Sequence, residues 1–196
     1  MTTEAHTAED PRPTFTRALD QAERQVAAVR PDEMTGPTPC TEYDVRALLG
    51  HVVMVLHMLA HAGKGGDALD APNVVDGVAD DGWADAFARG RSEVEQVWAD
   101  DEKLDSLVRL PWAQLPGRIA IEAYTHELTV HSWDIARATG RLADLDPDLG
   151  ARALEGFSQF APPETRSEQG PFGPIVPVSD DADVYTRLAA FLGRRP

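Results

Sequence analysis

Residues 116–140 read PGRIAIEAYTHELTVHSWDIARATG, and this stretch predicts the helix from which we derive the rest of the fold. Its proline stands at the first helical position and Gly140 follows the last turn, as is typical of helix boundaries. Apolar residues spaced three or four apart, or an aspartate in capping position, predict further helices elsewhere. These cover residues 14–30, 45–62, about 81–98, 146–160 and 180–192.

Irregular segments separate the predicted helices. Proline and glycine mark loops at residues 31–43 and 161–179, and residues 65–80 show no clear period. Residues 106–112 alternate between apolar and polar side chains, which predicts a short extended segment. Substantial helices joined by long connections predict an all-α fold. We expect a four-helix bundle with crossover connections and extra C-terminal helices.

The chain has 196 residues, 42% of them apolar, which is enough for one domain with a real core. Residues 1–12 are polar, acidic and broken by proline, so we expect a disordered tail followed by a single domain over residues 13–196. A net charge of −15 repels phosphates and anionic lipids, which excludes nucleic acid and membranes as natural partners. The single cysteine, and the absence of a signal peptide or membrane-length apolar run, predict a cytoplasmic protein.

Candidate metal ligands lie on the helix quoted above. Glu127 and His131 are four residues apart, so they project about 40° from each other on one face. One turn of helix thus brings a carboxylate and an imidazole to a common point, as a divalent metal requires. Asp134 continues this face, where it is expected to accept a hydrogen bond that orients the imidazole. The candidate third ligand is His51, which lies on an otherwise apolar helical stripe and needs a buried partner.

Other interpretations of the histidines stay open at this point. His57 and His61 form a second pair four residues apart, but they lie roughly 240° and 280° around the helix from His51. His126 points away from His131 and is expected to be exposed. A histidine on an apolar face is more often a hydrogen-bonded core residue than a ligand. An isolated Glu-x-x-x-His is usually an ordinary surface pair, so spacing alone does not establish a metal site.

Cys40 lies a few residues before the 45–62 helix, whose dipole can lower the pKa of a nearby thiol. One interpretation is therefore a reactive thiol near the metal, and the alternative is a small packed residue in a tight loop. Trp112 and Trp133 likewise have two interpretations, as pocket lining or as core.

Three segments carry a family resemblance. They read TPCTEYDVRALLGHVV at 38–53, HELTVHSWDIARATG at 126–140 and FGPIVPVSDDADVYTRLAAFLGRRP at 172–196. Together they resemble the actinobacterial metal-binding relatives of mycothiol-dependent maleylpyruvate isomerase, in the DinB-like superfamily of metal-binding bundles. The resemblance spans nearly the whole chain. It implies a ligand set of one histidine on the second helix, with a glutamate and a histidine one turn apart further along, which carries over onto His51, Glu127 and His131.

The resemblance also implies a divalent metal, zinc by its ligand set, with an open position and with mycothiol as a thiol cofactor. We therefore expect a mycothiol- or other thiol-dependent isomerase or transferase that acts on a small electrophile. Two alternatives stay open: a zinc-dependent hydrolase that uses metal-bound hydroxide, and a non-catalytic metal-binding or sensing protein. The expected partners are a small-molecule substrate or thiol, and a homodimer is compatible with the sequence. The ligand set suits zinc but tolerates nickel, iron or manganese.

Overall fold

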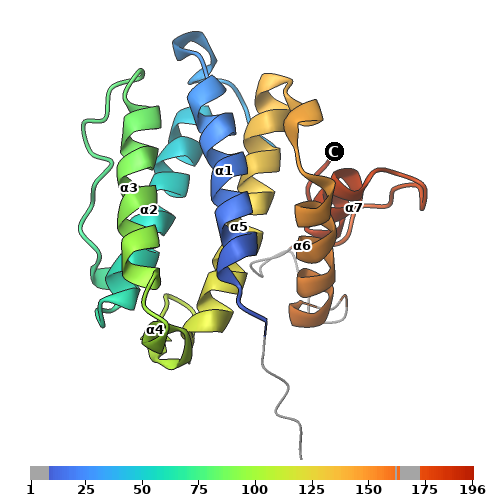
Figure 1. Cartoon of the computed structure of the whole chain (residues 1–196). Coiled ribbons are helices and arrows are strands. Elements are labelled where there is room, and N and C mark those ends of the chain that lie inside the picture. Colours follow the sequence, from blue (N-terminus) through green and yellow to red (C-terminus); the bar gives the residue numbers. More distant parts are fainter. Residues whose placement is uncertain (1–8, 162, 164–172) are drawn as a thin grey trace, which may run out of the picture.

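The structure is a computed structural model that describes residues 9–161, 163 and 173–196. Long helices form a bundle, and two further helices lie beside it (Figure 1). The bundle consists of α1 (Arg12–Ala28), α2 (Val45–Gly63), α3 (Trp83–Trp98) and α5 (Gly117–Thr139). The two added helices are α6 (Pro147–Phe160) and α7 (Val184–Phe191). The all-α class and the extra C-terminal helices expected from the sequence are confirmed.

The packing order of the bundle differs from the order of its helices along the chain. α2 packs against α3 and α5, and α1 also packs against α3 and α5. α1 and α2 therefore occupy opposite corners of the bundle, as do α3 and α5. The connection from α1 to α2 and the connection from α3 to α5 both cross the bundle, which confirms the predicted crossovers.

Short elements occupy the connections. They are 3-10 turns at Pro31–Glu33, Ala68–Asp70 and Leu142–Asp144, α4 (Glu102–Asp105), and an antiparallel hairpin of β1 (Leu107–Arg109) and β2 (Gln114–Pro116). β1 confirms the extended segment predicted at residues 106–112. α4 and β2 were not predicted from the sequence.

Aspartates at the predicted capping positions begin two of the helices. The Asp44 carboxylate accepts the backbone N–H of Ala47 at the start of α2, and Asp146 accepts that of Asp148 at the start of α6. At the end of α5, Gly140 adopts a φ of 74°, a left-handed conformation that glycine reaches without steric strain. The N-cap aspartates and the terminal glycine were therefore read correctly from the sequence.

The starts of α1 and α7 differ from the predicted residues. α1 begins at Arg12 rather than at residue 14, because the Asp10 carboxylate accepts the Arg12 N–H and proline fits the first turn. α7 begins at Val184 rather than at residue 180, because the Asp183 side chain caps the helix there. Residues 1–8 of the predicted tail lie outside the described residues. So do residues 162 and 164–172 of the predicted 161–179 loop.

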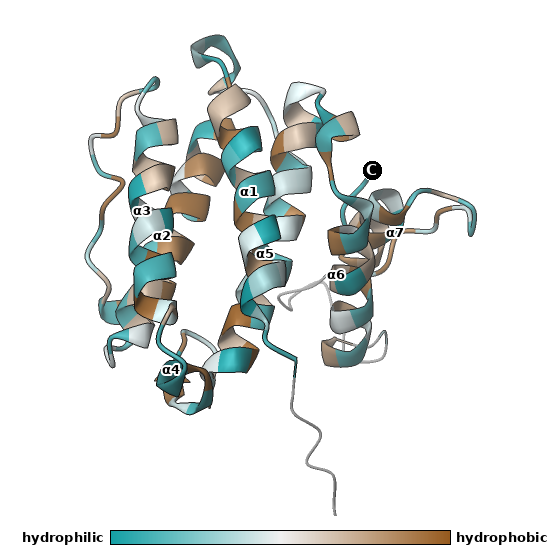
Figure 2. Ribbon diagram, in the orientation of Figure 1, coloured by the Kyte–Doolittle hydropathy of each residue, from teal (hydrophilic) through white to brown (hydrophobic). Residues whose placement is uncertain are grey.

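The core lies between the bundle helices, with a second apolar cluster where α5 meets α6 and α7. α1 presents hydrophilic residues on the side that faces the viewer in Figure 2, while apolar residues gather between the helices. α2 is long and apolar enough to cross a membrane by length and composition, but most of this helix is buried against its neighbours. A core helix of a bundle passes the same test, and the packing of α2 matches that role.

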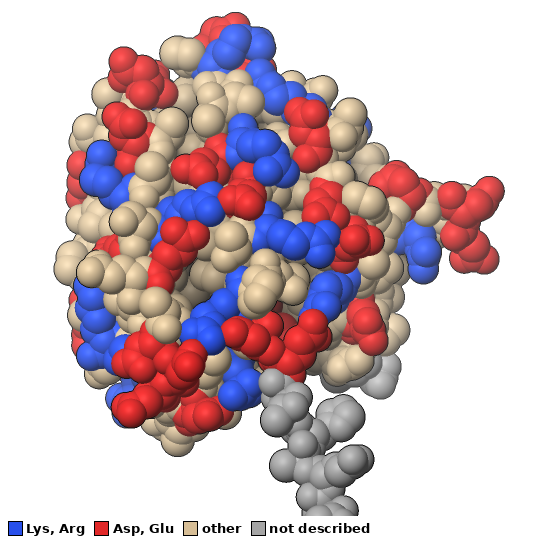
Figure 3. All heavy atoms as spheres, viewed as in Figure 1, with Lys and Arg blue, Asp and Glu red and all other residues tan. Residues whose placement is uncertain are grey.

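The face of the molecule drawn in Figure 3 carries acidic and basic side chains interspersed among one another. Among such pairs, Arg91 of α3 contacts Asp20 and Glu23 of α1 and Glu95 of its own helix. These contacts join α1 to α3 across the surface. Many of the acidic residues on this face therefore have basic neighbours.

Candidate metal centre

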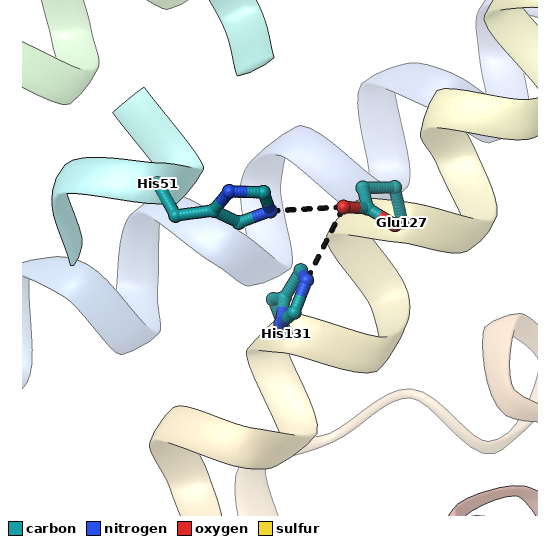
Figure 4. Close-up of side chains that lie close together, drawn as sticks. All are labelled: His51, Glu127 and His131. Atoms are coloured by element: carbon teal, nitrogen blue, oxygen red, sulfur yellow. Dashed lines mark hydrogen bonds and ion pairs between the residues drawn. The ribbon is translucent and has the colours of Figure 1, made fainter. Parts of the chain in front are cut away.

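The three residues predicted as metal ligands lie together between α2 and α5 (Figure 4). His51 comes from α2, and Glu127 and His131 come from consecutive turns of α5. His51 Nε2 lies 2.9 Å from Glu127 Oε1, and His131 Nε2 lies 3.2 Å from the same oxygen. The potential ligand atoms of the three residues all lie within 4.8 Å of one another. Within the described part of the chain, no other trio of His, Cys, Asp or Glu side chains meets this spacing.

Aromatic contacts hold the two imidazole rings at a fixed angle. The ring of Tyr43 stacks on His51 with centroids 5.3 Å apart and an interplanar angle of 25°. His51 in turn meets the His131 ring edge to face, with centroids 4.7 Å apart. Tyr43 immediately precedes the residue that caps α2, so the start of that helix also fixes the position of the stacking ring.

A buried carboxylate, that of Asp134, accepts a hydrogen bond from the His131 nitrogen that faces away from Glu127. His131 Nδ1 donates to Asp134 Oδ2 at 2.9 Å, and the Asp134 side chain is completely buried. Arg194 donates from Nε to Asp134 Oδ1 at 2.8 Å and from Nη2 to Oδ2 at 2.9 Å. Because Nδ1 carries the donated hydrogen, Nε2 is the nitrogen that His131 presents to Glu127.

The carboxylates also set the charge of the site. Burial alone would lower the pKa of His131, but Glu127 and Asp134 outweigh burial and raise the His131 pKa to about 9. Burial would raise the pKa of Glu127, yet the two imidazoles hold it well below its ordinary value. Burial would also raise the pKa of Asp134, but His131 and Arg194 outweigh burial and lower it. The protein without metal thus pairs a carboxylate with a protonated imidazole, so a divalent cation would replace a proton at this point.

The donor set fits a divalent metal. Two imidazole nitrogens and one carboxylate oxygen form the His2Glu set of open zinc sites. Ligand bonds of about 2.0–2.2 Å place neighbouring donors of a tetrahedron roughly 3.3–3.5 Å apart, close to the two observed distances from the imidazole nitrogens to Glu127 Oε1. The side chains of His51 and Glu127 are 26% and 37% exposed, so solvent reaches one side of the trio. A fourth ligand from outside the chain has access there.

The other histidines of α2 lie outside this cluster. His57 Nδ1 lies 2.7 Å from Glu93 Oε2, in a hydrogen bond that joins α2 to α3. The His61 ring packs against Gly66, where an added Cβ would lie 2.2 Å from Nε2. The angular argument from the sequence therefore correctly separated His51 from these two residues.

The prediction that His126 is exposed was wrong. Its ring is partly buried against α6, with its centroid 5.8 Å from that of Phe157. Burial lowers the pKa of His126 to about 4, with a smaller contribution from Arg152. The sequence did not reveal this environment, because it arises from α6 packing on the side of α5 away from the metal ligands.

Cys40 is half-buried, and this burial raises the pKa of its thiol although Arg194 lies near enough to oppose the shift. The direction is opposite to that expected from the α2 dipole, and it favours the packed-residue interpretation. Trp133 is core, buried with the C-terminal cluster, whereas Trp112 is 51% exposed and packs edge to face on Phe160.

Sequence reasoning did not identify Tyr43 and Arg194 as parts of the site. Tyr43 lies within the segment that carried the family resemblance, so its proximity to His51 offered a usable signal. Arg194 lies 60 residues beyond Asp134, and no spacing rule connects them. Only the packing of the C-terminal segment against α5 brings them together.

The comparisons with known proteins show the family of this chain. The family model described as the mycothiol maleylpyruvate isomerase N-terminal domain matches residues 15–136, a range that contains all three clustered residues. The chain belongs to this family. Two uncharacterized proteins of Mycobacterium tuberculosis, Rv0738 of strain H37Rv and MT0763 of strain CDC 1551, are each 31% identical to it over 185 residues. Each alignment covers 94% of this chain and 98% of the relative, which confirms the expected actinobacterial relationship.

A solved structure supports the fold. The crystal structure of the mycothiol-dependent maleylpyruvate isomerase matches with a TM-score of 0.55 and 14% sequence identity. The match covers 69% of this chain and 63% of the isomerase, so the chain spans less than two thirds of that protein. At this identity the likeness concerns the fold alone, and it confirms the DinB-like bundle.

Proposed function

We propose that His51, Glu127 and His131 bind one divalent metal ion, zinc by its donor set, and that the protein is a thiol-dependent isomerase or transferase. Its substrate would be a small electrophile and its thiol mycothiol or a similar compound. The observation that carries the proposal is the convergence of two imidazole nitrogens on one carboxylate oxygen at a solvent-accessible position. Membership of the mycothiol maleylpyruvate isomerase family supports the choice of thiol.

The chain's own residues have separate tasks in this proposal. Asp134 holds the proton of His131 on Nδ1, which leaves the Nε2 lone pair for the metal. Glu127 supplies negative charge, and Tyr43 keeps the His51 ring from rotating. A bound zinc ion would supply electrostatic stabilisation of a thiolate, which is the reactive form of a thiol at neutral pH.

In this proposal the nucleophilic thiol comes from outside the protein. Cys40 is the single cysteine of the chain, and burial raises its pKa rather than lowering it. A thiol with a raised pKa is largely protonated at neutral pH and reacts slowly. This favours a low-molecular-weight thiol cofactor that enters from the exposed side of His51 and Glu127.

Solvent access also supports a second candidate, a zinc-dependent hydrolase. The exposure of His51 and Glu127 admits water to the open position as readily as a thiol. The third candidate, a non-catalytic metal-binding or sensing protein, has less support, because the bundle already has a large apolar core that needs no metal to close it.

The proposal also covers location and extent. Acidic composition, a single cysteine and a buried α2 support action in the cytoplasm. The active unit would be one domain over residues 13–196.

The decisive experiment is calorimetry with mycothiol on zinc-loaded protein, metal-stripped protein and a Glu127→Gln variant. We expect binding to the loaded wild type, and at least tenfold weaker binding to the other two. Substitution of His61 by glutamine is the matched control, because His61 lies on the same helix but outside the cluster. Equal binding with and without metal, or no binding at millimolar mycothiol, would overturn the thiol proposal. In the second case, metal-dependent ester hydrolysis would support the hydrolase.

A further inference from the structure

The last residues of the chain turn back toward the candidate metal centre. α7 ends at Phe191, and Gly193 then adopts a φ of 82°. The Arg194 N–H donates to the carbonyl of Ala189 at 2.9 Å, which closes the turn against the helix. A side chain at residue 193 would be strained in this conformation. The turn therefore gives the following arginine a defined direction.

From this turn the Arg194 side chain extends to the buried carboxylate of Asp134. Its guanidinium contacts both oxygens of Asp134, at 2.8 and 2.9 Å, in a bidentate pair. The Asp134 side chain is 0% exposed and that of Arg194 is 14% exposed. Paired N–H groups of this kind fix the plane of the carboxylate as well as its distance. Asp134 cannot rotate without breaking one of these two bonds.

Asp134 passes this constraint on to His131. Its Oδ2 accepts the hydrogen of His131 Nδ1 at 2.9 Å, on the side of the ring opposite the nitrogen that faces Glu127. A carboxylate that accepts from a metal-binding histidine fixes both the tautomer and the ring orientation. The contacts thus run without a break from the end of α7 to one proposed metal ligand.

We propose that Arg194 is a positioning residue of the metal centre, through which the C-terminal turn holds Asp134 and thereby the ring of His131. This inference rests on the proposed metal site and adds a role for a segment outside the matched family domain, which ends at residue 136. The C-terminal helices are then part of the functional unit. Their packing on α5 keeps one ligand in place.

The test compares Arg194→Ala and Arg194→Lys with Arg195→Ala, whose wild-type side chain is the exposed neighbour in sequence. Zinc affinity is measured by competition with a chromogenic chelator, and ligand geometry by the visible spectrum of the cobalt-substituted protein. Loss of the direct partner of a metal ligand typically weakens metal binding about 10–100-fold. Arg194 acts one contact further out, through Asp134, so Arg194→Ala should weaken zinc binding by up to about tenfold. Lysine offers a positive charge but not the paired N–H donors of a guanidinium, so the zinc affinity of Arg194→Lys should be intermediate. Arg195→Ala should match the wild type.

Thermal unfolding of the metal-free variants separates positioning from mere stabilisation. A folded Arg194→Ala or Arg194→Lys protein with unchanged zinc affinity and cobalt spectrum would overturn the inference, even if its unfolding temperature fell. If removal of Arg194 leaves the protein unfolded, the folded lysine variant gives the answer. A wild type that binds no metal would instead overturn the proposed function itself. The two failures are therefore distinguishable.

Discussion

Single residues of the site differ in how much protein surrounds them. His131 is 6% exposed and has carboxylates on both ring nitrogens, whereas His51 and Glu127 face solvent in part. A buried imidazole held from both sides has little freedom to move away from a metal. His131 is therefore the ligand whose removal the site should tolerate least, and Glu127 is the one that joins both imidazoles.

Replacement of His131 by alanine should reduce bound metal several-fold or more, because it removes one of three proposed ligands and leaves the others incomplete. Elemental analysis of purified protein measures the stoichiometry. His61→Gln serves as the control and should keep the wild-type metal content. Unchanged stoichiometry in the His131 variant would contradict the assignment, and loss in the control would indicate that the wrong histidine pair was chosen.

The thiol of Cys40 should react with iodoacetamide more slowly at pH 7 than a free cysteine does. Its pKa is raised by burial, so the thiolate fraction is smaller, and the rate should continue to increase above the pH at which free cysteine levels off. Folded protein is compared with protein in denaturant, where the difference should vanish. Faster alkylation in the folded state would show an activated thiol instead.

At the scale of elements, two glycines of α2 differ in how closely the neighbouring side chains approach them. A Cβ at Gly63 would lie 2.6 Å from Val97 Cγ1 and 3.0 Å from the Trp98 ring. A Cβ at Gly50 would lie 3.6 Å from Trp83, an ordinary contact distance. One glycine is thus required by helix packing, and the other occupies a position where a methyl group fits.

Gly63→Ala should therefore lower the free energy of unfolding by about 1–3 kcal/mol, as overpacking of a closed core does. Gly50→Ala should raise it by up to about 1 kcal/mol, because alanine is the better helix former in a helix interior. Denaturant unfolding of the metal-free proteins measures both values. Equal effects of the two substitutions would mean that α2 and α3 can separate without loss.

At the scale of the whole molecule, Asp146 joins the bundle to the C-terminal helices. Its carboxylate contacts Arg17 of α1 at 2.6 Å, and its backbone N–H donates to Gln21 of the same helix. Its carbonyl accepts the hydroxyl of Tyr185 from α7. Burial opposes ionisation of Asp146, but Arg17 and the N–H of Asp148 outweigh it and lower its pKa. One residue thus connects three helices.

Asp146→Asn keeps an oxygen that can cap α6 but removes the charge, so it should destabilise the protein at pH 7 by about 0.5–1 kcal/mol. The folded carboxyl has the lower pKa, so its contribution is present above the ordinary value of about 3.9 and is lost as pH falls below it. Unfolding free energies at pH 7, 5 and 3 should therefore converge for variant and wild type at the acidic end. Asp148→Asn is the control. Its side chain also lies near Arg17, at 3.3 Å, but it is 79% exposed, so the loss of its charge should matter less. A difference that does not change with pH would contradict the charge effect.

The sequence by itself determined the class of fold, and its family resemblance supplied the proposed ligand trio. Helical period, capping aspartates and Gly140 are local signals, so they fixed where α2 and α5 lie and which face of each carries His51, Glu127 and His131. Tertiary structure alone decided what surrounds those residues. Arg194, the stacking of Tyr43 and the burial of Cys40 and His126 all depend on contacts between segments distant in the chain, and no spacing rule describes such contacts. Desolvation raises the pKa of the Cys40 thiol although Arg194 opposes it, which is the reverse of the shift expected from the α2 dipole.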